Sequence, residues 1–277
     1  MKKLFVHAIP VLFCACSLTA ARAQMDMKDA QIEFGFFGGI SIPNLTASGS
    51  MNNPLNTGYS SRLGPDFGLV REMHFSKLFS VETKLEYSSQ GGKKDGFQAF
   101  PTPALAALYF QSQGMQAPPY LYANFKSEIR LNYLKFPLLA KLGWNLDDQG
   151  HFRFSVAAGP FLGILLSAHQ VTSGGGNVYA DPQGQQQFPG GPQSFDSTDN
   201  IRSQLHKANF GADGNIGIAY MFGKDKVQKI FLEAGGNYGF INIQKGSDDG
   251  KNNTGAATVL LGYTYKLTFK PMHGKMF

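Results

Sequence analysis

The chain has 277 residues, of which only 16% are charged, and it uses glycine (33) and phenylalanine (24) heavily. Soluble domains usually carry about 25% charged residues, so this composition indicates a β-rich chain with many turns. The formal net charge of +6 falls to +3 once the basic residues of the N-terminal segment are removed, which excludes the strongly basic surface of a nucleic-acid-binding protein.

The N-terminal segment has the features of an export signal. Lys2 and Lys3 precede an apolar stretch from residue 4 to residue 20, and Ala21-Arg22-Ala23 places small residues at the two positions that signal peptidase reads. We expect residues 1–23 to be a signal peptide and residues 24–277 to form the mature domain, beginning at Gln24. No apolar run of ~20 residues follows, so no membrane helix is expected.

Both cysteines, Cys14 and Cys16, leave with this signal, and the mature chain then has no disulfide. A lipoprotein would instead be anchored at Cys16, but Phe13 makes a poor lipobox. An exported domain of this size without disulfides needs another source of stability, and a closed barrel in lipid provides one.

Period-two alternation of apolar and polar residues recurs along the mature chain and predicts β-strands. In the last segment Val259, Leu261, Tyr263 and Tyr265 share one face, and Leu260 breaks the pattern. We expect eight strands, at residues 31–42, 64–74, 79–90, 127–143, 151–168, 207–222, 229–243 and 256–269.

The fourth of these strands changes phase. A β-bulge near Tyr133–Leu134 would restore one continuous apolar face and turn Lys135 and Lys141 to the polar side. Pro137 cannot donate to the strand ladder, which also indicates local irregularity.

The connections alternate between long and short without exception, with long loops at residues 43–63, 91–126, 169–206 and 244–255. Outer-membrane barrels have short periplasmic turns, long external loops and an even strand count. The sequence therefore predicts an all-β fold, an eight-stranded antiparallel transmembrane β-barrel with long extracellular loops, in the outer membrane of a Gram-negative bacterium.

Aromatic residues flank the short turns and predict a girdle at one membrane interface; they are Phe75, Phe79, Trp144, Phe152, Phe222, Phe231 and Phe269. The alternative is a soluble sandwich or lipocalin-like barrel with its apolar residues inside. Alternation alone does not separate inside from outside, so the prediction of a membrane barrel depends on the loop lengths.

Twelve charged residues lie on the polar faces of the predicted strands, seven of them on the third and fourth strands; they are Glu33, Glu82, Lys84, Glu86, Glu128, Arg130, Lys135, Lys141, Arg153, Asp213, Glu233 and Lys266. An eight-stranded barrel is just wide enough for its side chains to fill. Buried charges must then pair, so we expect a plug of salt bridges; an ion or proton path is the alternative.

Two central motifs and a later one resemble the PorT-like outer-membrane β-barrel family. Residues 131–141, LNYLKFPLLAK, are similar to that family's YLEIPLLLKY strand, residues 158–163 to AGPYLG, and residues 239–243 to GLTNI. Lys135 replaces the family's usual acid. The resemblance implies an outer-membrane barrel; a founding member is linked to protein secretion across the outer membrane, and most members have no assigned role.

Chemistry-bearing residues form no recognisable site. His169 and His206 enter the same long loop, where two imidazoles sharing a metal are an alternative to solvated rim residues. Ser167 with His169 and an aspartate (Asp196 or Asp199) has no geometry that indicates a hydrolase. We therefore predict no catalytic, cofactor-binding or metal-binding residues and no cofactor.

The long loops contain the remaining residues that bear on function. The glycine-, glutamine- and proline-rich residues 174–200 are expected to be mobile. Residues 103–110 are apolar and helix-capable, and an exposed apolar patch usually has a partner; a short helix packed on its own loop is the alternative. We expect a non-enzymatic barrel whose loops bind a partner or assist an envelope or secretion assembly, with outer-membrane lipid and other envelope proteins as partners; a small-solute channel is the alternative.

Overall fold

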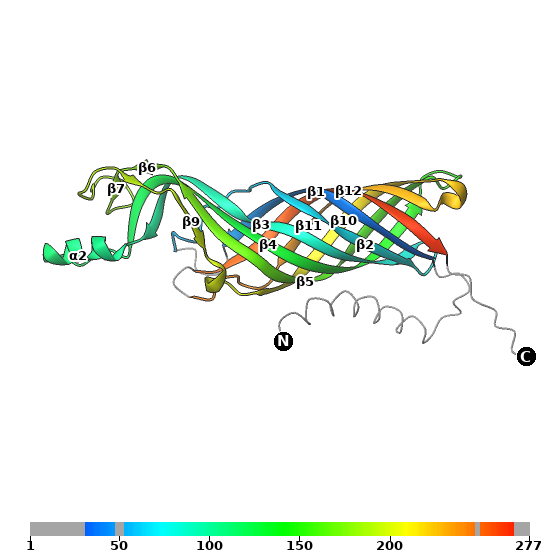
Figure 1. The fold of residues 1–277 in the computed structure, drawn as a ribbon, viewed down its shortest axis with the longest axis horizontal. Helices are drawn as coiled ribbons and strands as arrows, with labels where there is room; N and C mark the ends of the chain where they lie inside the picture. The colour runs from blue at the N-terminus through cyan, green and yellow to red at the C-terminus, as the bar shows by residue number, and fades with distance from the viewer. Residues whose placement is uncertain (1–30, 48–52, 247–249, 269–277) are drawn as a thin grey trace, which may run out of the picture.

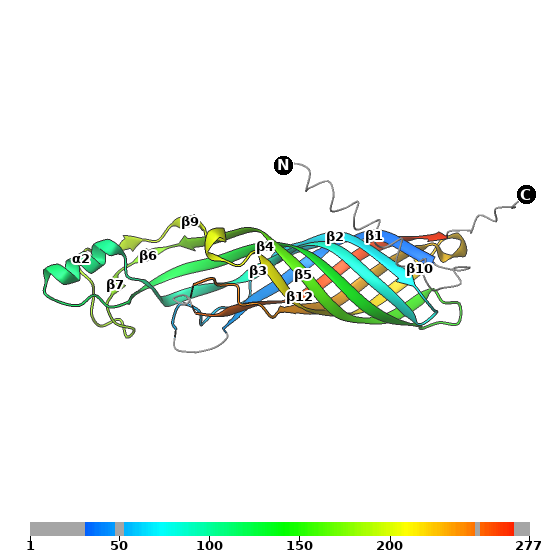
Figure 2. The ribbon, with the colours of Figure 1, turned by 90° about the horizontal axis from the view of Figure 1, so that it is seen from below.

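A computed structural model describes residues 31–47, 53–246 and 250–268. The predicted signal peptide and Phe269 lie outside these residues. Eight antiparallel strands close into a ring, because β12 pairs with β1 and β4 pairs with β5 (Figures 1 and 2). In ring order the strands are β1 (Gln31–Ala47), β2 (Gly64–His74), β3 (Phe79–Pro101), β4 (Tyr120–Asn145), β5 (Phe152–Ser173), β10 (Ala208–Phe222), β11 (Gln228–Gly239) and β12 (Asn252–Thr268).

The predicted fold class is confirmed, and β2 has the predicted bounds. The main error concerns length. β3, β4 and β5 continue well beyond the predicted ends, so much of the expected loops 91–126 and 169–206 is sheet. These segments alternate weakly in sequence because one face packs on the core beneath α2 and the other is largely exposed, so neither faces lipid or the lumen.

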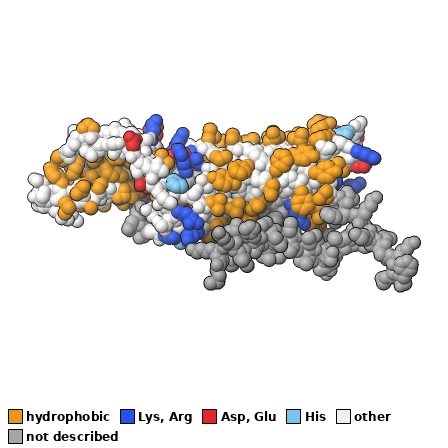
Figure 3. Space-filling view, viewed as in Figure 1, with side chains coloured by type: hydrophobic (Ala, Val, Ile, Leu, Met, Phe, Trp, Pro, Cys, Tyr) orange, Lys and Arg blue, Asp and Glu red, His pale blue; other side chains and the backbone are white. Residues whose placement is uncertain are grey.

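Side chains point as a membrane barrel requires. Leu138 on β4 and Leu261 on β12 are 51% and 59% exposed, whereas Glu82 and Lys84 on β3 are 1% and 3% exposed. A soluble barrel would show the reverse arrangement, with apolar side chains inside and charges outside. Figure 3 shows apolar side chains covering the visible face of the barrel wall.

The irregularity predicted near Tyr133 is present, but on the neighbouring strand. The register between β4 and β5 shifts between Asn132 and Tyr133, and the extra residue is Leu166 of β5. β4 therefore keeps its alternation, and Tyr133 and Lys135 both point inward. The predicted bulge in β4 is thus wrong, although the inward position of Lys135 and Lys141 is confirmed.

The irregularity predicted from Pro137 lies on the other side of β4. Opposite Phe136–Pro137, the ladder between β3 and β4 is interrupted at Lys84–Leu85.

Exposed aromatic rings mark the end of the barrel that carries the short turns. Phe75 contacts Phe79 with ring centroids 5.8 Å apart, and Phe152 contacts Tyr220 at 5.1 Å. Phe231 was expected in this girdle but is 5% exposed and lies in the lumen. Since short turns are periplasmic in such barrels, the opposite end is extracellular.

A long sheet extension rises from the extracellular end (Figure 1). The upper parts of β3, β4 and β5 form it, together with the short strands β6 (Gly175–Gly176), β7 (Val178–Tyr179), β8 (Gln193–Ser194) and β9 (Ser197–Asn200) and the helix α2 (Ala104–Ser112). Two 3-10 turns complete the fold, η2 (Arg202–Gln204) and η3 (Lys224–Lys226). No helix among the described residues is long and apolar enough to cross a membrane.

This topology predicts opposite accessibility for two epitope tags. A tag after Gly190, in the exposed loop between β7 and β8, should be labelled by antibody on intact cells. A tag between Asp148 and Gln149, in the β4–β5 turn, should be labelled only after the outer membrane is permeabilised. The reverse pattern would contradict the orientation of the barrel.

Candidate functional site

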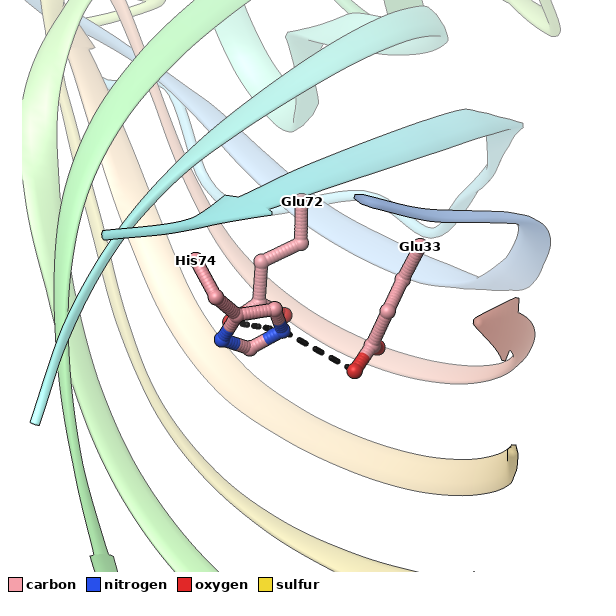
Figure 4. Close-up of side chains that lie close together, drawn as sticks. All are labelled: Glu33, Glu72 and His74. Carbon is pink, nitrogen blue, oxygen red and sulfur yellow. Dashed lines mark hydrogen bonds and ion pairs between the residues drawn. The ribbon is translucent and has the colours of Figure 1, made fainter. Parts of the chain in front are cut away.

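The lumen holds a network of buried charges that starts near the periplasmic end. Glu33 of β1 and Glu72 of β2 point inward beside His74 (Figure 4), whose Nε2 lies 2.9 Å from Glu33 Oε1 and 3.7 Å from Glu72 Oε1. Lys229 of β11 forms ion pairs with both carboxylates and donates to Glu72 Oε2 at 2.7 Å. One ammonium group therefore joins two neighbouring strands to β11.

The network continues on the other strands. Lys84 Nζ lies 3.0 Å from Glu82 and 2.7 Å from Glu233, while Lys141 Nζ lies 2.6 Å from Glu82 and 3.0 Å from Glu233. Lys141 also reaches Glu72 at 3.5 Å, which connects this group to the first. All of these side chains are at most 8% exposed.

A third group lies further toward the extracellular side. Lys135 Nζ is 2.8 Å from Glu86 and 3.2 Å from Asp213 of β10. Asp66 is fully buried nearby on β2 and accepts a hydrogen bond from Ser88 Oγ at 3.0 Å. Buried charges of this kind are stable only when they are paired, and each of these lysines has at least two carboxylate neighbours.

Apolar side chains fill the space that the charges leave. Phe37, Val70, Phe231 and Leu260 form a buried cluster inside the barrel, and the ammonium groups of Lys84 and Lys141 lie 5.3 Å and 5.9 Å from the Phe37 and Phe231 ring centroids. A second cluster blocks the extracellular mouth; it contains Leu45, Ile129, Leu131, Tyr133, Leu165, Ala168, Ile201, Leu205 and Ile243. The two clusters therefore obstruct the lumen at two levels, and a small pocket lined by Glu72, Lys141, Lys229 and Glu233, among others, remains beside the ion network.

Sequence reasoning found most of this network but not all of it. Of the twelve expected lumen charges, Glu128 and Arg130 lie instead at the extracellular rim, with side chains 28% and 48% exposed. Arg153 is at the periplasmic rim, where it donates to the Lys77 carbonyl oxygen at 2.8 Å, and Lys266 is only half-buried near the same end. Asp66, Glu72 and Lys229 were missed. Asp66 lies between the apolar residues Pro65 and Phe67, whereas Glu72 follows Arg71 and Lys229 follows Gln228, so alternation marks these two less clearly.

Glu33, Glu72 and His74 are the one group among the described residues whose ligand atoms could hold a metal ion, since one atom from each lies within 4.8 Å of the others. Carboxylate and imidazole ligands suit zinc and similar ions. However, Lys229 already pairs with both carboxylates. A metal ion would compete with this ammonium group, so the arrangement is better explained as part of the ion network.

The residues weighed as a metal or hydrolase site are not brought together. His169 pairs with Asn200 of β9, and the His206 amide donates to the Ile243 carbonyl. Ser167 Oγ accepts a hydrogen bond from Asn132 at 2.9 Å. Within the part of the chain that the structure describes, no hydrogen bond or ring contact joins these histidines to each other or to Ser167.

The tip of the extension has a small core of its own. α2 buries Ala106 and Phe110 against Leu121, Ala123, Phe125 and Val178. The helix is thus packed on its own extension, as in the alternative of a short helix packed on its own loop. Its opposite face stays exposed, however, with Leu105 83% and Leu108 59% exposed. Residues 174–200, expected to be mobile, contribute Val178, Phe188 and Phe195 to this core and form short strands.

Charge is unevenly distributed over the extension. From Gly96 to Phe125 the sequence has no charged residue, and residues 174–200, which contribute to the same core, carry only Asp181, Asp196 and Asp199. On the face drawn in Figure 3, charges gather where the extension meets the barrel. At that junction Arg130, and then Arg62, lower the pKa of Glu128 to about 2. The Arg62–Glu128 ion pair, at 2.7 Å, fixes the β1–β2 loop to β4.

The same loop is held a second time by Lys94. Its ammonium group donates to the Leu55 carbonyl at 2.7 Å and to the Pro54 carbonyl at 3.3 Å. Burial under the loop lowers the pKa of Lys94 to about 8. Residues 53–63 of the β1–β2 loop are therefore a fixed part of the extracellular surface.

Comparison with known proteins identifies the class. A family model described as the outer membrane protein beta-barrel domain matches residues 22–245, and the chain belongs to this family. The protein is thus an outer-membrane β-barrel of a Gram-negative bacterium. No curated protein matches the sequence.

Solved barrels of several kinds are similar in structure. The attachment invasion locus protein Ail of Yersinia pestis is 10% identical, covers 85% of this chain and 99% of its own, and has a TM-score of 0.32. OprG of Pseudomonas aeruginosa is 11% identical (87% and 96% covered, TM-score 0.36), and the outer membrane protease OmpT of Escherichia coli is 8% identical (90% and 99% covered, TM-score 0.29). Likeness at this level does not assign an activity to this chain.

The ion network predicts a large stability loss when one carboxylate is removed. Glu233→Ala leaves Lys84 and Lys141 each without one partner in a buried site and should lower the free energy of unfolding by about 3–5 kcal/mol. Glu128→Ala, at the rim, should lower it by about 0–1 kcal/mol. Urea unfolding in lipid vesicles, followed by the fluorescence of Trp144, the single tryptophan, measures both. Equal losses would contradict the proposed importance of the network.

Proposed function

We propose that this barrel is a non-enzymatic binding protein that anchors an extracellular sheet in the outer membrane and presents it to another protein, within an envelope or secretion assembly. The observation that carries the proposal is the contrast between the two ends of the molecule. The lumen is filled with paired charges and apolar plugs, while the tip exposes apolar side chains far from the membrane.

The construction of the extension supports a binding role. A helix with no charged residue is fixed on a sheet by its Ala106 and Phe110 and exposes Leu105 and Leu108 on the other side. Exposed apolar patches of this kind usually mark sites of interaction with another molecule. The core beneath the helix keeps this surface in one conformation, which lowers the entropy lost on binding.

The resemblance to PorT-like barrels supports a place in an envelope or secretion assembly. The strand that carries the main motif is β4, and its Lys135 stands where the family has an acid. In this chain Lys135 is neutralised by Glu86 and Asp213, so the change of sign is accommodated without opening the lumen. The signal peptide at residues 1–23 and the mature start at Gln24 belong to the same proposal.

The alternative, a small-solute channel, makes a different prediction. An obstructed lumen should give no steady conductance when the purified barrel is inserted into planar bilayers, because paired charges cross it and an apolar cluster blocks its extracellular mouth. A general porin treated in the same way serves as the positive control. Steady single-channel steps from this protein would favour the channel.

A binding role predicts crosslinks from the tip in living cells. A photoreactive amino acid at Leu108 on α2 should form a protein adduct, because this side chain is exposed on the extracellular surface. The same residue at Leu138, which is 51% exposed on the lipid-facing wall, is the matched control and should form no protein adduct of that mass. The absence of any adduct specific to position 108 would contradict a binding role for the tip.

A further inference from the structure

One edge of the extracellular sheet is left open. β3 has 23 residues, but its pairing with β2 ends at Ser88, opposite Asp66. The β1–β2 loop covers the next part of this edge, where Ser60 pairs with Lys93 through two backbone hydrogen bonds of 2.8 and 3.0 Å. From Asp95 to Pro101, β3 pairs with β4 on one side and with no described segment on the other.

The hydrogen bonds of Lys93 and Thr102, at the two ends of this stretch, show which way its backbone N–H and C=O groups point. The Lys93 N–H and C=O both point to Ser60, away from β4, and the Thr102 N–H points to the Pro119 carbonyl on the β4 side. Successive residues of a strand direct these groups to opposite sides. Both ends therefore indicate that odd-numbered residues point to the open edge and even-numbered residues point to β4. Asp95, Phe97 and Ala99 therefore present their N–H and C=O groups at the open edge.

The other edges of the extension are covered or short. β7 pairs with β4 and is itself bonded on its far side by the segment from Gln186 to Phe188. β9 pairs with the upper part of β5 and is the last strand on that side of the sheet, but it has only four residues and carries Asp199. Proteins usually protect a free edge with charges, prolines or covering segments, yet the open stretch of β3 has a charge, Asp95, only at its start and a proline, Pro101, only at its end.

We propose that this edge, Asp95–Pro101 of β3, accepts an extended, uncharged segment of a partner protein as an additional antiparallel strand. The proposal rests on the binding role given above and names the chemistry of the partner. Main-chain hydrogen bonds to Phe97 and Ala99 supply the affinity, as in other cases of strand addition. The Ser60–Lys93 bridge is the existing example of antiparallel pairing on the same edge.

The side chains around the edge favour an uncharged segment. Phe97 contacts the rings of Tyr122 and Tyr179, with centroid distances of 6.0 and 5.7 Å. Asp95, the one charged residue of this stretch, already forms an ion pair with Lys126 at 3.5 Å, and no charged residue lies between Gly96 and Phe125 to pair with a charge on the partner. The exposed side chains of α2 are too few for a stable interface alone, since specific interfaces use about 20–30 residues on each side.

The direct test uses the full-length protein in lipid nanodiscs and a capped octapeptide of alternating valine and threonine as the probe. Hydrogen exchange of the Phe97 and Ala99 amides should slow by at least about tenfold when the peptide is bound, because both N–H groups become donors to it. A peptide of the same length with proline at every second position should give no protection. Unchanged exchange at both amides at saturating octapeptide would overturn the proposal.

A backbone variant separates this edge from other surfaces. Ala99→Pro removes an outward N–H without affecting pairing to β4, because proline is tolerated at the open side of an edge strand. Ala99→Ser keeps the N–H and is the matched control. Ala99→Pro should weaken octapeptide binding by about tenfold, equivalent to ~1.4 kcal/mol, and Ala99→Ser should leave it unchanged. Equal binding by the two variants would contradict strand addition.

The crosslink from position 108 separates strand addition at β3 from the binding role of the tip. If its protein adduct forms in the parent and is lost in Ala99→Pro but not in Ala99→Ser, strand addition is supported in cells. If the adduct is undiminished in Ala99→Pro, strand addition is wrong and the binding role stands. If no adduct forms in the parent, the binding role itself is wrong, whatever the octapeptide shows.

Discussion

Pairing of buried charges across the lumen is the interaction on which the rest of the structure depends. Lys84 of β3 and Glu233 of β11 are 149 residues apart in sequence, yet their side chains meet at 2.7 Å inside the barrel. Neither charge is stable there alone, because an unpaired buried ion is strongly unfavourable. The network therefore forms only when the strands have closed in the correct register, and it joins opposite walls of the ring once they have.

A closed and filled barrel determines what the extracellular end can do. With opposite walls joined by Lys141 and Lys229, the barrel is a rigid base, and β3, β4 and β5 leave it as one continuous sheet. The β1–β2 loop supports this sheet through Arg62 and Lys94. The tip, with its uncharged segment from Gly96 to Phe125, is thus held at a fixed distance from the charged rim, where a partner can reach it without contacting lipid.

Alternation in the sequence predicted the strands and the common face of Glu82 and Lys84, since both depend on a period of two within each strand. The regular change between long and short connections then predicted the closed antiparallel ring and which of the two faces lies inside. Neither pattern predicted the bulge at Leu166, because the shift is a property of the pairing between two strands. Phe231 was assigned to the girdle because its place beside a turn outweighed its phase with Lys229 and Glu233. The extension was read as loops because neither of its faces meets lipid.

An open strand edge is a risk for a soluble protein, since identical edges pair antiparallel with each other and aggregate. Anchoring in the membrane changes this. All copies in one outer membrane share an orientation, so β3 of every copy runs away from the cell surface as it approaches Pro101. Two such strands, related by rotation about the membrane normal, are never antiparallel, and the edge of one copy is a poor partner for the edge of its neighbour. The barrel thus limits pairing of this edge with its own kind while leaving Asp95, Phe97 and Ala99 available to a strand that approaches from outside.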